Sequence, residues 1–311
     1  MTLKKILVPK IEFYITNVCN LSCERCNRFN NHAFRGQQIW QDYSDIYKQW
    51  SEVIDIGQIV VLGGEPLLNP SIIEWVKGIN QLWNRPVQIL SNGTRINQVH
   101  GLYDVIQHAN IPIDDTYHAN MLGISLHDTN TLPELDDSIR EFLKGNVKRF
   151  SKDVPWVTDS YGHSVDFVYV DVDKHIRIPI WIQDSFNNAA LQLTQEGKFT
   201  LHQNDPNLAH SICGFAIEKC YHFIKGKLYK CGPVALFPEF DQQHTLDISD
   251  EDRILINSYQ PLTVDEFHNQ GPEFLKNIDN AIPQCKFCPV TLDNKKITAF
   301  RKNSKILDNI S

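Results

Sequence analysis

Residues 11–26 read Ile-Glu-Phe-Tyr-Ile-Thr-Asn-Val-Cys-Asn-Leu-Ser-Cys-Glu-Arg-Cys. The apolar run at 11–15 predicts a β-strand, and it leads directly into three cysteines with the spacing Cys19-x3-Cys23-x2-Cys26. Three thiolates on one short loop can hold three irons of a 4Fe-4S cluster and leave the fourth iron open. A zinc knuckle with His32 as its fourth ligand is the structural alternative. The stretch therefore predicts a strand followed by a metal centre.

Strands and helices alternate through the first half of the chain. Further apolar runs predict strands at 59–62, 87–90 and 121–126. Apolar side chains at helical spacing predict helices at 43–54, 70–82, 99–106 and 133–143. Single helices between strands require crossover connections, so the sheet should be parallel and should bind ligands at the carboxyl ends of its strands. Beyond residue 145 the rhythm is less regular, with strand-like runs at 165–172, 176–182 and 198–202.

A second motif follows the strand predicted at 59–62, where residues 62–66 read Leu-Gly-Gly-Glu-Pro. Because glycine has no side chain, backbone carbonyls in this loop can approach a ligand closely and hold its amino group. A zinc knuckle has no use for such a loop. The position of this glycine-rich loop, one strand after the cysteines, favours an iron–sulfur cluster over zinc.

Cys19, Cys23 and Cys26 after the first strand, with Gly63-Gly64-Glu65-Pro66 after the second, are similar to the two signature motifs of the radical S-adenosylmethionine (SAM) superfamily. The resemblance implies that the open iron binds SAM. One electron, supplied by a reductase such as flavodoxin or ferredoxin, then cleaves SAM to a 5'-deoxyadenosyl radical that removes hydrogen from a substrate. The implied fold class is α/β, a partial (β/α)6 radical SAM barrel over roughly residues 8–205.

The same resemblance implies further contacts with SAM. They fall on the glycine-rich loop, on two later strand ends and on the residue before the third cysteine: Gly63, Gly64, Glu65, Pro66, Ser91, Asn92, Ser125 and Arg25. The family usually has an apolar or aromatic residue at the position of Arg25, where a guanidinium can also stack on a base. An ordinary Asn-Gly turn at 91–94 is the alternative for Ser91 and Asn92.

Five cysteines remain in the second half of the chain. Cys213 and Cys231 flank a hairpin predicted at 221–230, and Cys285-x2-Cys288 lies downstream of a helix predicted at 263–282. Four such ligands can converge on one metal centre. The arrangement resembles the Twitch domain, a shortened SPASM domain that carries one auxiliary 4Fe-4S cluster, and a four-cysteine zinc site is its alternative. Cys220 is left over, and we expect it to be a buried structural thiol.

These patterns predict two domains, a radical SAM core at 1–205 and a hairpin-plus-helix auxiliary-cluster domain with the C-terminal tail at 206–311. The turn-rich stretch at 204–207 marks the boundary. The first cluster cysteine stands at position 19, which leaves no room before it for a leader-peptide-binding domain. We therefore expect a small polar substrate, and a peptide or protein maturase is the second choice.

The expected reaction is a two-electron oxidation assisted by the auxiliary cluster. Such a reaction needs a base, and the candidates near predicted strand ends are His127, Asp128, Asp171 and Asp173, while Arg177 could orient a substrate. A solvated charge or a packed histidine is the alternative for each. The loop at 28–36 combines arginine, histidine and phenylalanine, and it either contributes to the active site or only covers the cluster. A non-catalytic zinc protein is the alternative from another class.

Composition limits the remaining choices. The chain has 311 residues, 42% hydrophobic and 22% charged, which is typical of a globular protein. It has 30 Lys and Arg against 37 Asp and Glu, a net charge of −7, so general nucleic-acid binding is not expected. We find neither a signal peptide nor an apolar run long enough to cross a membrane, and a cytoplasmic protein follows. Its eight cysteines are then more suited to metal binding than to disulfides.

Overall fold

We describe the protein from a computed structural model of the chain. The described residues are 5–108, 111–113, 116–118, 120–154, 157, 163–183, 185–186, 190–291, 295–296 and 298–301. The rest of the C-terminal tail, which was included in the predicted second domain, lies outside these ranges.

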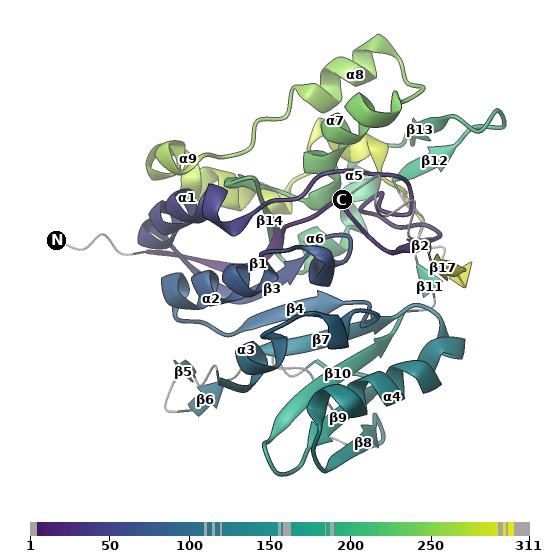
Figure 1. Cartoon of the computed structure of the whole chain (residues 1–311). Coiled ribbons are helices and arrows are strands. Elements are labelled where there is room, and N and C mark those ends of the chain that lie inside the picture. The colour runs from purple at the N-terminus through teal and green to yellow at the C-terminus, as the bar shows by residue number, and fades with distance from the viewer. Residues whose placement is uncertain are drawn as a thin grey trace.

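A nine-stranded mixed sheet forms the centre of the fold, in the order β15-β14-β1-β3-β4-β7-β10-β9-β8 (Figure 1). Six adjacent strands are parallel: β14 (Cys220–Ile224), β1 (Ile6–Tyr14), β3 (Ile54–Leu62), β4 (Val87–Ser91), β7 (Met121–Leu126) and β10 (Ile176–Ile182). Antiparallel strands add to the two ends of this series, with β15 (Lys227–Tyr229) beside β14, and β9 (Phe167–Asp171) and β8 (Val147–Ser151) beside β10. The α/β class is confirmed.

Helices cross over between the first strands, as the sequence pattern predicts. They are α1 (Trp40–Val53), α2 (Ile72–Trp83), α3 (Leu102–His108) and α4 (Leu132–Leu143). Their apolar sides bury Trp50, Trp75 and Ile139 against the sheet, in a core that includes Ile11 and Phe13 of β1. Strand side chains alternate between faces, so Lys10 and Glu12 point away from this core. The opposite face of the sheet is therefore free to be lined by polar side chains.

The regular βα repeat ends after α4, which differs from an expectation of six such units. The fifth strand of the series, β10, is preceded by β8 and β9, and the short turn at 172–175 joins β9 to β10. His175 in this turn has a φ of 58°, in the left-handed region. Strands joined by so short a turn must run antiparallel. The sixth parallel strand, β14, comes instead from beyond residue 205 and pairs with β1 on its other side.

The predicted hairpin at 221–230 forms β14 and β15, and its turn residues Lys225 and Gly226 both have positive φ, 50° and 73°. Around the hairpin lie α5 (Pro206–Ser211), α6 (Gly214–Ile217), α7 (Gly232–His244), α8 (Asp250–Asn257) and α9 (Val264–Lys276). In Figure 1, α7 and α8 lie beyond the β14 end of the sheet. A second core joins Tyr14 and Phe29 to Phe237 and Phe240. Residues after 205 thus pack directly on the first half, and the boundary near 205 stays a prediction.

Short elements complete the described chain. The strands are β2 (Leu21–Cys23), β5 (Ile111–Ile113), β6 (Thr116–His118), β11 (Ser185–Phe186), β12 (Leu191–Leu193), β13 (Phe199–Leu201), β16 (Lys295–Lys296) and β17 (Ala299–Arg301). The 3-10 turns are η1 (Pro66–Leu68), η2 (Ile96–Gln98), η3 (Thr129–Thr131), η4 (Asn277–Asp279) and η5 (Pro283–Phe287). Across the described ranges, no helix is long and apolar enough to cross a membrane.

Candidate active site

The cysteine loop begins directly after β1 and is fixed by the glycine-rich loop after β3. Gly64 N donates to Thr16 O over 2.7 Å, and Glu65 N donates to Val18 O over 2.8 Å. A Cβ on Gly64 would lie 2.3 Å from Val18 O and 2.9 Å from Cys19 Cβ. The glycine is therefore required because the chain that leads into Cys19 packs directly on it. This differs from the sequence-based reason, which was close approach to a ligand.

Glu65 connects the loop after β3 to the loop after β4. Its carboxylate is fully buried and accepts hydrogen bonds from Ser91 Oγ and Asn92 N, each over 2.7 Å, and from Leu67 N over 3.0 Å. Burial raises the pKa of Glu65 to about 7, against the opposing effect of these hydrogen bonds. Since both oxygens are used within the protein, Glu65 acts on a ligand through the loops that it positions.

Asn20, between the first two cysteines, extends this network to the cysteine loop. Its Nδ2 donates to Thr94 Oγ1 over 2.7 Å, and its Oδ1 accepts from Asn92 Nδ2 over 2.9 Å. Thr94 N and Oγ1 in turn donate to Asn92 Oδ1. The segment 91–94 is thus bonded directly to the cysteine loop. Sequence reasoning missed Asn20, although its place inside the cysteine spacing was the available signal.

A cavity of about 270 Å³ opens beside this network, at the carboxyl ends of β4 and β7. Its lining comes from the cysteine loop, the loop after β4, the end of β7 and β17: Leu21, Asn92, Thr94, Leu126, His127, Asp128, Thr131, Glu134, Ala299 and Arg301. His127 Nδ1 lies 3.1 Å from Gln183 O, and burial lowers the pKa of His127. Strand β17 pairs antiparallel with β2, so a segment near the C-terminus covers the cysteine loop.

Sulfur spacing distinguishes the two kinds of metal centre. A tetrahedral zinc ion with Zn–S distances of about 2.3 Å holds its sulfurs about 3.8 Å apart. Among the described residues, which include all eight cysteines, three or more ligand atoms come within 4.8 Å of one another only in the group Glu12, Cys220 and His222. The Cys19, Cys23 and Cys26 sulfurs do not all lie within 4.8 Å of one another, and His32 packs its ring on Phe199. The triplet therefore suits a multinuclear cluster better than zinc.

The four later cysteines line a second cavity, of about 380 Å³. Cys213 and Cys231 precede α6 and α7, and Cys285 and Cys288 belong to the turn around η5. Burial raises the pKa of the Cys231 thiol to about 12, and the neighbouring Cys213 adds to the effect. Lys230 lines the same cavity, as does Asn27 from the first cysteine loop. The structure thus brings the four cysteines together near the first loop.

Cys220 is separate from that cavity. It is fully buried in β14, and burial strongly raises the pKa of its thiol. Its neighbours are Glu12 and His222, with His222 Nε2 placed 2.7 Å from Glu12 Oε2. Arg28 also donates to Glu12 Oε2. Burial opposes ionisation of Glu12, but the charges of Arg28 and His222 outweigh it and hold the pKa of Glu12 well below its ordinary value. Arg28 thus supplies the positive charge that a metal ion would bring.

The remaining predicted site residues are dispersed. Asp171 ends β9 as expected, but β9 runs antiparallel, so Asp171 and the nearby Asp173 and Arg177 lie at the edge of the sheet where β10 begins, opposite the cysteine loop. Ser125 is buried on β7. Arg25 is half-buried with a φ of 61°.

Other predicted residues are used in packing. In the loop 28–36, Phe29 and Phe34 belong to the second core, and Pro66 is buried at the start of η1.

The sequence of this region is similar to a known protein family. Residues 13–152 match the family model described as Radical SAM superfamily. The chain is also similar to two proteins named Probable GTP 3',8-cyclase. That of Methanothermobacter thermautotrophicus is 33% identical over 87 residues, 28% of this chain and 28% of that protein. That of Methanocaldococcus jannaschii is 25% identical over 142 residues, 46% of this chain and 43% of that protein. The matched segment spans less than half the length of either relative.

Two solved structures superpose on most of the chain. SuiB of Streptococcus suis, bound to S-adenosylmethionine, gives a TM-score of 0.41 at 12% identity and covers 91% of this chain and 72% of SuiB. BtrN in complex with AdoMet and 2-DOIA gives a TM-score of 0.42 at 12% identity and covers 95% of this chain and 99% of BtrN.

Proposed function

We propose that the protein is an enzyme that cleaves SAM reductively and oxidises a small polar substrate, because residues 13–152 match the family model described as Radical SAM superfamily. Cys19, Cys23 and Cys26 would hold a 4Fe-4S cluster with one open iron. The observation that carries this proposal is the bonding of the glycine-rich loop to the backbone that enters Cys19, which ties the two family motifs into one unit.

The chain's own residues would bind and orient SAM at this unit. The loops that carry Gly63, Gly64, Ser91 and Asn92 converge on the cysteine loop, and Glu65 fixes their relative positions through three hydrogen bonds. His127 and Thr94 line the adjoining cavity. Strand β17 covers the loop and would help to exclude water from it.

Cys213, Cys231, Cys285 and Cys288 would hold a second 4Fe-4S cluster, and the region after 205 would be the auxiliary-cluster domain. When bound, the first cluster and SAM would supply a radical that takes a hydrogen atom from the substrate. The substrate radical would then lose a proton to a base and an electron to the second cluster, which completes a two-electron oxidation. All four cysteines face one cavity, so this centre would be closed by protein thiolates. A reductase would supply the electron for SAM cleavage.

The test is metal content and SAM cleavage after anaerobic reconstitution. We expect about eight irons per chain and formation of 5'-deoxyadenosine with SAM and a strong reductant. Cys23→Ala should abolish 5'-deoxyadenosine and remove about four irons, and Cys285→Ala should remove about four irons from the other site. Cys220→Ala is the matched control and should keep all of the iron. Zinc with little iron, or cleavage by Cys23→Ala, would refute the proposal.

A further inference from the structure

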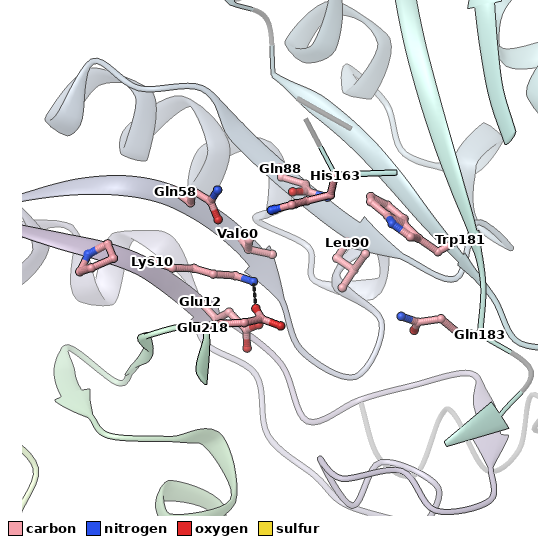
Figure 2. A pocket seen from close by; sticks show the side chains of 11 residues that line it. Lys10, Glu12, Gln58, Val60, Gln88, Leu90, His163, Trp181, Gln183 and Glu218 are labelled. Carbon is pink, nitrogen blue, oxygen red and sulfur yellow. Dashed lines mark hydrogen bonds and ion pairs between the residues drawn. The ribbon is translucent and has the colours of Figure 1, made fainter. Parts of the chain in front are cut away.

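The largest of the cavities described lies on the inner face of the sheet and has a volume of about 680 Å³ (Figure 2). Side chains from four parallel strands and two flanking segments line it: Pro9, Lys10, Glu12, Gln58, Val60, Gln88, Leu90, His163, Trp181, Gln183 and Glu218. Lys10, Glu12 and Glu218 also line the four-cysteine cavity, so the two cavities share a wall. The volume is in the range of small-molecule sites.

The floor of this cavity depends on Gly123 of β7, which lies between β4 and β10. A Cβ on Gly123 would come within 2.5 Å of the Trp181 ring and 3.1 Å of Gln88 Nε2. Because glycine stands there, the indole from β10 and the amide from β4 approach each other across β7. They form a surface with one aromatic and one hydrogen-bonding part, and Figure 2 shows both facing the space.

Three amide side chains reach this space from different strands: Gln58 from β3, Gln88 from β4 and Gln183 from just beyond β10. In the part of the chain that the structure describes, none of these three amides has a hydrogen-bond partner. Gln88 is only 6% exposed. Its amide is open to the cavity, where a ligand with hydroxyl or amine groups would hydrogen-bond with it.

The charges that line the cavity are already paired. Lys10 Nζ lies 2.5 Å from Glu218 Oε2, as the dashed line in Figure 2 marks. Glu12 is bonded by Arg28 and His222. Among the described residues that line the cavity, Lys10 is the one lysine or arginine, and it faces the carboxylates of Glu12 and Glu218. A triphosphate placed here would meet no uncommitted cation and would bury several uncompensated negative charges.

We propose that this cavity is the substrate site and that its ligand is a polyhydroxylated ring, uncharged or bearing an amine, and without phosphate groups. The inference rests on the proposed function and names the substrate class of that enzyme. The ring's apolar face would stack on Trp181, and its hydroxyl or amine groups would bond with Gln58, Gln88 and Gln183. This substrate class differs from GTP, the nucleotide in the name of the similar GTP 3',8-cyclases.

The experiment uses the anaerobically reconstituted enzyme with SAM and reductant, and it measures 5'-deoxyadenosine above the rate without substrate. The probes are GTP and a metabolite extract of the source cells. The extract is divided by size, and its small molecules are divided again into those retained and those not retained by an anion exchanger. We expect the unretained small molecules to raise the rate about tenfold or more. Gln88→Leu should lose this increase, and Gln192→Leu, an exposed glutamine on β12, should keep it.

Stimulation by GTP, by the retained anions or by the fraction of peptide size would overturn the inference, as would stimulation by no fraction. The same increase in Gln88→Leu as in the wild type would also overturn it. In each of these outcomes the enzyme still forms 5'-deoxyadenosine at its basal rate without substrate. If the proposed function itself were wrong, no 5'-deoxyadenosine would form under any condition.

Discussion

Ser91 Oγ donates a hydrogen bond to Glu65 Oε1 over 2.7 Å, and this contact joins the loop after β3 to the loop after β4 inside a fully buried environment. Both loops also bond to the cysteine loop, through Val18 and Asn20. The candidate SAM site is thus a set of three loops fixed by buried polar contacts, and the predictions begin there.

Glu65 should make stability depend on pH. Its pKa is about 7 in the folded chain and 4.5 in the unfolded chain, so the folded state binds the proton more tightly. The stabilisation is complete below pH 4.5 and is lost as the pH rises to about 7, by about 3 kcal/mol in all. Glu65→Gln should remove this dependence. Denaturation midpoints between pH 5 and pH 8 measure it, and Glu251→Gln, an exposed site on α8, should follow the wild type.

Asn20→Ala should weaken SAM binding. The substitution removes two hydrogen bonds that fix the cysteine loop to Asn92 and Thr94, and each is worth about 1 kcal/mol, so the Kd should rise by about thirtyfold. Anaerobic calorimetry measures the affinity. Asn97→Ala, an exposed asparagine that bonds to α4, is the control and should bind SAM as the wild type does. An unchanged Kd in Asn20→Ala would show that the network does not shape the SAM site.

Glu12→Gln should destabilise the fold far more than Glu218→Gln. The first substitution leaves the buried Arg28 without its counter-ion, which costs about 3 kcal/mol. The second breaks an ion pair whose carboxylate is 58% exposed, and it should cost less than about 1 kcal/mol. Urea denaturation of the two variants measures the difference. Equal losses would contradict the buried pair's structural role.

Lys230→Met should lower the reduction potential of the second cluster. Lys230 lines the four-cysteine cavity, and its ammonium donates to Asn277 O. Its positive charge would stabilise the electron that the cluster gains on reduction, so its loss should make the cluster harder to reduce. The expected shift is on the order of 50 mV. A redox titration followed by electron paramagnetic resonance measures it, in enzyme that lacks Cys19, Cys23 and Cys26. Lys225→Met, at the exposed hairpin turn, should leave the potential unchanged. A reduction potential in Lys230→Met equal to that of the wild type would refute the prediction.

The sequence predicted the local features well, because each depends on a short pattern. The strand at 121–126, the strand at 176–182 and the turn at Lys225-Gly226 all form where periodicity and turn residues place them. The cysteine spacing likewise identified the loop after β1. Such patterns suffice because strand alternation and glycine turns depend on neighbours in the chain.

Long-range pairing was not predictable in the same way. Nothing local in residues 220–224 indicates that they pair with β1, or that β9 runs antiparallel to β10. The pairing of Glu12 with Arg28 and the bonding of Asn20 to Thr94 join segments that only the fold brings together. For this reason the polar network around the cysteines, and the composition of the large cavity, required the structure.

The central claim is that the thiolates of Cys19, Cys23 and Cys26 leave an iron open for SAM. The direct measurement is electron paramagnetic resonance of the reduced first cluster, in enzyme with Cys285→Ala and Cys288→Ala so that its signal is isolated, before and after SAM is added. We predict that SAM changes the g-values of the signal. An identical spectrum with saturating SAM would contradict the account.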